Sequence, residues 1–156
     1  MQRILAVGVL ALALTARADA LSDSRAIAEA FVKAANIEDP NESVKQVLTL
    51  FADDAQHLGV FGHLEGKAAF QEVLPKIFAA PNRKNELVSH EGTQLSKDVI
   101  VSISHFLNSF SGPDGKTVTL PLRCVRTLKK QKDGRYLIAA EHTSVGVPPP
   151  PAPPSK

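Results

Sequence analysis

Apolar residues recur about every 3.6 positions in the first half of the chain and at every second position in the second half. The first spacing predicts three helices, of which Ser24 can cap the first and Gly66 precedes the third. Asp39 and Pro40 are typical of a helix start, because aspartate caps free amides and proline lacks the amide that the first turn leaves unpaired. The apolar faces of the three helices consist of Ile27, Ala30, Phe31, Ala34 and Ala35; of Val44, Val47, Leu48 and Phe51; and of Phe70, Val73, Leu74, Ile77 and Phe78.

The segments between these helices carry their own signals. Asp53 and Asp54 predict the end of the second helix, and the glycines within residues 55–66 favour a short hairpin before the third. Pro75 removes one backbone hydrogen bond from the third helix, which predicts a kink or an early stop.

Alternating apolar residues predict four strands after residue 82, over residues 86–95, 99–110, 117–132 and 135–145. The connections between them are short and rich in glycine, aspartate and proline, which favours an antiparallel meander. We therefore predict an α+β domain with three N-terminal helices packed on a curved, mainly antiparallel sheet made of the hairpin and the four-strand meander.

Two ionisable side chains fall on the apolar stripes of these strands. The stripe of Val99, Val101, Ile103 and Leu107 includes His105, and the stripe of Leu120, Leu122, Cys124 and Leu128 includes Arg126. A lone charge in an apolar core costs several kcal/mol, so these residues predict either a polar pocket or satisfied core positions. The opposite face, with Ser102, Ser104, Phe106, Asn108 and Phe110 beside Arg123, predicts a two-fold subunit interface or a solvated surface.

The turn at Asp133 and Gly134 leaves two registers open for the last strand. A two-residue type I′ turn places Glu141 opposite Arg126 on the inner face. A type I turn with a bulge at Gly134 shifts the register by one residue. That second register turns five side chains inward, those of Tyr136, Ile138, Ala140, His142 and Ser144.

The two ends of the chain differ from the middle. Residues 4–14 form an apolar run that is followed by Ala18-Asp19-Ala20, a pattern that predicts a signal peptide over residues 1–20 and export to the periplasm or the medium, with no membrane attachment after cleavage. Residues 148–156 contain six prolines and predict an extended or disordered tail. The folded domain is therefore expected to span residues 21–147.

Charge and cysteine content exclude several classes of function. The 156 residues include 18 basic and 16 acidic side chains, without the concentrated basic face that nucleic-acid binding needs. The single cysteine, Cys124, reads as a small buried residue and cannot form an internal disulfide. Five scattered histidines lack metal-site spacing, and no glycine-rich phosphate loop occurs. We expect no metal, cofactor or nucleic acid.

Three segments carry a resemblance to a known family: Phe51-Ala52-Asp53-Asp54-Ala55, Leu64-Glu65-Gly66-Lys67, and residues 133–144, which begin Asp-Gly-Arg-Tyr. Together with the order of elements, they resemble the SnoaL-like branch of the nuclear-transport-factor-2-like superfamily. The resemblance implies a cone with an internal pocket, frequent dimerisation through the sheet, and Asp54 near the cone mouth. It also favours the register that turns Tyr136, His142 and Ser144 inward. It implies no single chemistry, because the scaffold serves many.

Two functional hypotheses follow. The protein binds a small, largely apolar molecule in the pocket, as a homodimer through the outer face of the sheet; or it is an acid–base enzyme of isomerase, cyclase or dehydratase type that acts on a carbonyl compound. In the second case His142 or Asp54 is the catalytic base. The expected pocket residues are His105, Arg126, Tyr136 and Ser144, and Tyr136 is the only tyrosine that could stabilise an oxyanion.

Overall fold

The computed structural model describes residues 21–60 and 62–146. The predicted signal peptide and the proline-rich tail lie outside these residues, so both remain predictions. Residues 21–35 form the first helix, followed by α2 (Pro40–Leu48) and, after a hairpin, by α3 (Gly66–Phe78). The strands are β1 (Phe51–Gly59), β2 (Gly62–Glu65), β3 (Lys84–Ser96), β4 (Val99–Ser111), β5 (Thr117–Lys130) and β6 (Tyr136–Val145).

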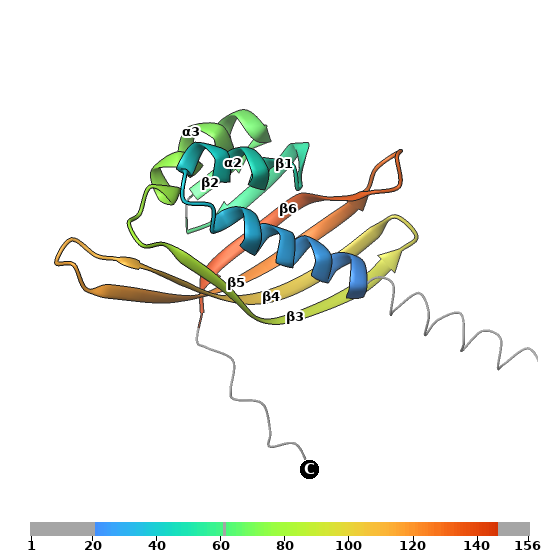
Figure 1. The fold of residues 1–156 in the computed structure, drawn as a ribbon. Helices are drawn as coiled ribbons and strands as arrows, with labels where there is room; N and C mark the ends of the chain where they lie inside the picture. The colour runs from blue at the N-terminus through green and yellow to red at the C-terminus, as the bar shows by residue number, and fades with distance from the viewer. Residues whose placement is uncertain (1–20, 61, 147–156) are drawn as a thin grey trace, which may run out of the picture.

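The strands form one curved sheet in the order β2-β1-β6-β5-β4-β3, and the helices lie on one side of it (Figure 1). All neighbouring strands are antiparallel except β1 and β6, which are parallel. The long helix of residues 21–35 follows the hollow side of β3 to β5, while α2 and α3 lie above the β1 side (Figure 1). The predicted α+β architecture, with three helices on a hairpin and a meander, is confirmed.

The start of α2 agrees with the sequence, but its end does not. Asp39 Oδ1 accepts a hydrogen bond from the Glu42 amide at 2.8 Å, and Pro40 occupies the first turn. The helix ends at Leu48, whereas Phe51 and Asp54 belong to β1. Phe51 pairs with Ile138 of β6, so pairing with a distant strand takes this segment out of the helix that its spacing favoured.

Of the two outcomes expected for the third helix, a kink or an early stop, the early stop is wrong. Pro75 lies inside α3, which continues to Phe78. Proline in the last turn removes a single hydrogen bond, and the carbonyl of Pro75 still accepts from the Ala79 amide at 3.0 Å. The cost is therefore confined to one turn, which the packing of Phe70, Leu74 and Phe78 in the core offsets.

The prediction of which β4 residues face the core is also wrong. Ile100, Ser102, Ser104 and Phe106 are buried against the helices, and the alternate positions, including His105, face outward. Ser104 can enter the core because its hydroxyl has a partner. Ser104 Oγ lies 2.9 Å from His90 Nδ1, and His90 Nε2 lies 2.8 Å from Ser24 Oγ in the first helix.

A bulge in β6 combines the two registers that the sequence left open. Next to the turn, where Gly134 has φ +88°, Leu128 pairs with Ile138, as in the bulged-turn register. The pairing then shifts, so that Thr127 pairs with Ala140 and Arg126 pairs with Glu141, as in the type I′ register. Because one extra residue enters β6 there, Ile138, Glu141 and Thr143 face inward, and the expected inward position of His142 is wrong.

Candidate functional site

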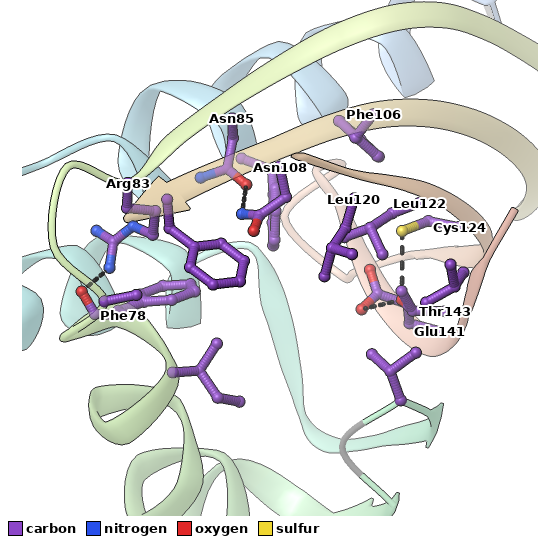
Figure 2. Close-up of a pocket in the computed structure, with 16 residues that line it drawn as sticks. Phe78, Arg83, Asn85, Phe106, Asn108, Leu120, Leu122, Cys124, Glu141 and Thr143 are labelled. Carbon is purple, nitrogen blue, oxygen red and sulfur yellow. Dashed lines mark hydrogen bonds between the residues drawn. The ribbon is translucent and has the colours of Figure 1, made fainter. Parts of the chain in front are cut away.

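A cavity of about 350 Å³ lies between the helices and the inner face of the sheet (Figure 2). Most of its wall is aromatic or aliphatic, and consists of Phe31, Val60, Ile77, Phe78, Ala80, Phe106, Phe110, Leu120, Leu122 and Val145. Its polar lining falls into two groups. One is Cys124, Glu141 and Thr143, which we call the acid end, and the other is Arg83, Asn85 and Asn108, which we call the amide end.

The acid end is held by a buried ion pair between neighbouring strands. Arg126 Nε on β5 donates to Glu141 Oε2 on β6 at 2.5 Å, and both side chains are almost fully buried. His57 Nδ1 on β1 lies 3.1 Å from Glu141 Oε1. The Arg126 guanidinium lies over the ring of Phe31, 4.4 Å from its centroid. The charges of the pair therefore compensate each other inside an apolar wall.

Electrostatics fixes the protonation states at the acid end. Burial alone would raise the pKa of Glu141, but the charge of Arg126 and the hydrogen bonds from His57 and Arg126 lower this pKa to about 2. Burial raises the pKa of the Cys124 thiol to about 11. Glu141 is thus ionised at neutral pH while Cys124 is protonated, which does not favour Cys124 as a nucleophile.

The amide end is fixed by a chain of carboxamides. Asn36 Oδ1 accepts from the Asn85 backbone amide at 2.7 Å, and Asn108 Nδ2 donates to Asn85 Oδ1, also at 2.7 Å (Figure 2). Arg83 donates to the carbonyls of Ala35, Ile37 and Phe78. Its guanidinium therefore joins the ends of the first helix and α3, and most of its donors are used in doing so.

The structure separates the site residues expected from sequence. Arg126 is buried at the inner face, as expected. His105, His142 and Ser144 instead line a groove on the outer face, where His105 Nδ1 lies 2.9 Å from Ser89 Oγ. The bulge in β6 and the inverted face of β4 explain these placements.

The two remaining candidates also lie away from the cavity wall. Asp54 is exposed on β1. Tyr136 is partly buried, and its hydroxyl donates to the carbonyl of Lys97 at 3.2 Å. Neither residue lines the cavity. A substrate in the cavity would therefore contact neither Asp54 as a base nor Tyr136 as an oxyanion donor.

Sequence reasoning missed His57 as a member of the inner cluster. His57 is one of the five scattered histidines to which the sequence assigned no role, but only 2% of its surface is exposed. The available signal was its position two residues after Ala55, which places both side chains on the same face of a strand. Glu141 faces inward in the type I′ register that the sequence left open, and the bulge decides that this register holds at Glu141 and Thr143.

Within residues 21–60 and 62–146, no group of three or more histidine, cysteine, aspartate or glutamate side chains could hold a metal ion. No helix in this part of the chain is long and apolar enough to cross a membrane.

No family model and no curated protein sequence matches the chain. Solved structures do match its fold. A ketosteroid isomerase-like protein from Erwinia carotovora atroseptica has a TM-score of 0.68 and 23% identity, over 82% of this chain and 97% of the other. A candidate dehydratase of the NTF2-like family from Streptomyces avermitilis has a TM-score of 0.68 and 13% identity, over 84% and 99%.

A third match is an NTF2-like protein with a cystatin-like fold from Novosphingobium aromaticivorans, with a TM-score of 0.67 and 16% identity over 87% of this chain and 90% of the other. The fold of this chain is therefore the cystatin-like cone of nuclear-transport-factor-2-like proteins. These matches confirm the fold that the resemblance implies, and none of the three names the SnoaL-like branch.

The ion pair predicts how Glu141→Gln changes stability. The variant leaves the charge of Arg126 buried without its partner, so the free energy of unfolding at pH 7 should fall by about 3 kcal/mol. Urea unfolding measures the change. Glu91→Gln, which alters an exposed carboxylate on β3, should change stability by less than about 0.5 kcal/mol.

The wild type and the Glu141→Gln variant also test the pKa of Glu141. This pKa is about 2 in the folded state and 4.5 ordinarily. The ionised Glu141 carboxylate therefore contributes its full stabilisation above pH 4.5, and this stabilisation is lost as the pH falls toward 2. The wild type should therefore lose more stability over this interval than Glu141→Gln. Equal losses would contradict the ion pair.

Proposed function

We propose that the protein binds a small, largely apolar molecule in the cavity without transforming it. The observation that carries this proposal is the cavity itself, about 350 Å³ in volume with a mostly aromatic and aliphatic wall. Small-molecule sites are typically cavities of roughly 300–1,000 Å³ with a few fixed polar groups. The acid end and the amide end would supply those groups.

The protonation state of Glu141 supports binding rather than catalysis. A carboxylate with a pKa of about 2 is a weak base near neutral pH, because proton transfer to it is unfavourable. Arg126 and His57 hold the carboxylate in place. The cluster is thus suited to orient a ligand more than to accept its proton.

An acid–base enzyme is the second candidate, and one observation favours it. Glu141 Oε1 lies 3.1 Å from His57 Nδ1, and a carboxylate in this position orients an imidazole for proton transfer. A base in this protein would then be His57, in place of His142 or Asp54. Among the solved structures of this fold, one is described as ketosteroid isomerase-like and another as a candidate dehydratase.

We also propose that the protein is exported and forms a homodimer. The support for export is the sequence of residues 1–20. The support for the dimer is a row of outer-face residues across four strands, Ile103, Val125, His142 and Leu58, which are neighbours in the strand pairing. Ile103 is 39% exposed and Leu58 is 59% exposed, so a second copy could cover apolar surface there.

Ligand binding can be measured with N-phenyl-1-naphthylamine, a neutral probe whose fluorescence rises in apolar sites. Leu122→Trp places a larger side chain in the cavity wall and should weaken binding about tenfold or more, equivalent to about 1.4 kcal/mol. Val88→Trp, at an exposed position outside the cavity lining, is the matched control. Equal affinity in the two variants would show that the probe binds elsewhere. Native mass spectrometry of purified protein should also show a bound molecule.

Exchange of the α-protons of 1-indanone for deuterium, followed by NMR, separates the two functions. The binding proposal predicts equal exchange rates for the wild type and His57→Gln. An acceleration that His57→Gln abolishes and His142→Ala retains would establish the enzyme instead. His142→Ala serves as the control because His142 lies on the outer face.

The dimer has its own test. Light scattering coupled to size-exclusion chromatography should give twice the mass of one chain for the wild type and the mass of one chain for Ile103→Lys, since a lysine there would bury a charge. Leu95→Lys makes the same kind of change at an exposed position outside the groove and should remain dimeric. A monomeric wild type would exclude the proposed interface.

A further inference from the structure

The residues that line the acid end, Cys124, Glu141 and Thr143, have no hydrogen-bond donor to spare. The Nη1 and Nη2 groups of Arg126 find no partner among the described residues, but Arg126 is not part of the cavity lining. Glu141 is ionised and can only accept, so Thr143 Oγ1 must be the donor in the 3.3 Å contact with Glu141 Oε1. A hydroxyl has one proton, so the Cys124 thiol is the donor in its 3.2 Å contact with Thr143 Oγ1. Both protons at the acid end are therefore used within the protein.

The acid end can still accept a hydrogen bond. The two oxygens of a carboxylate offer about four acceptor positions. Three are taken by Arg126 Nε, His57 Nδ1 and Thr143 Oγ1. One position remains on Glu141, which lines the cavity. A molecule bound at this end can satisfy it only by donating a hydrogen bond.

The amide end also offers an acceptor. The backbone amide of Asn85 donates to Asn36 Oδ1, which fixes the orientation of the Asn36 carboxamide. Asn85 Nδ2 then donates to Asn36 Oδ1 at 3.3 Å, so Asn85 Oδ1 is left to accept from Asn108 Nδ2. Figure 2 shows the oxygen of Asn108 turned away from Asn85. This oxygen is a second acceptor in the cavity wall.

The charges at the acid end limit which kind of hydrogen-bond donor a ligand can present to Glu141. A carboxylate at the acid end would lie against the ionised Glu141, and like charges repel strongly where water is excluded. An ammonium group would be an uncompensated charge, because Arg126 already balances Glu141. A neutral hydroxyl donates a hydrogen bond without either cost.

We propose that the ligand is a neutral apolar alcohol or phenol whose hydroxyl donates to Glu141 at the acid end. This inference rests on the proposed binding function and specifies the ligand class for the same cavity. An ether of the same size fills the cavity equally well but leaves the acceptor of Glu141 unpaired. An acid of similar shape is ionised at neutral pH, so at the acid end its charge would lie against that of Glu141.

Three matched probes test the proposal: 2-naphthol, 2-methoxynaphthalene and 2-naphthoate, each competed against N-phenyl-1-naphthylamine at pH 7. The wild type should bind 2-naphthol about tenfold more tightly than 2-methoxynaphthalene, and 2-naphthoate most weakly. Equal affinity for the naphthol and its ether, or tightest binding of the acid, would overturn the hydroxyl assignment. The proposed binding function would survive either result. It fails if no probe binds, or if Leu122→Trp affects none of them.

Replacing Glu141 assigns the preference to this residue. Glu141→Gln should reduce the ratio between 2-naphthol and its ether to less than about threefold, since an amide can serve either probe. If this variant does not fold, the double variant Arg126→Met/Glu141→Gln removes both charges of the pair and gives the same readout. An unchanged ratio in the folded variant would show that Glu141 is not the acceptor.

Discussion

The ion pair between Arg126 and Glu141 is the constraint on which the inner face of the sheet depends. Each charge alone would cost several kcal/mol at this depth, and together they are tolerated because the geometry is close and their neighbours are suitable. The pair connects β5 to β6, its carboxylate reaches His57 on β1, and its guanidinium lies over Phe31 of the first helix. It thus joins the helical layer to the strands that form the acid end of the cavity.

The position of Glu141 follows from one extra residue in β6. Without the shift between the Thr127 and Leu128 pairs, the turn at Gly134 would place His142 inside and Glu141 in solvent. The bulge lets Ile138 fill the core opposite Leu128 and lets Glu141 meet Arg126 two residues farther from the turn along β5. The bulge therefore decides that a carboxylate, and not an imidazole, faces the cavity from this part of β6.

Regular elements were predictable because their signals are local. The cap at Asp39, the hairpin before α3 and the alternation in the last four strands follow from neighbouring residues, and Arg126 stands out as a charge on an apolar stripe. The faces of β4 were not predictable in the same way. Ser104 is buried because His90 and Ser24, both distant in sequence, satisfy its hydroxyl through one chain of hydrogen bonds. The alternation of valine and isoleucine on the outer face gave the opposite impression.

The central claim is that an ionised Glu141 faces the cavity in partnership with Arg126. The most direct measurement is the pH titration of the Glu141 side-chain carboxyl carbon by NMR, in protein labelled at glutamate and assigned with Glu141→Gln. The structure predicts that the carboxyl stays ionised as the pH falls well below 4.5, with a midpoint near 2 or loss of the fold before it is reached. A midpoint at or above 4.5 in the folded protein would contradict the account.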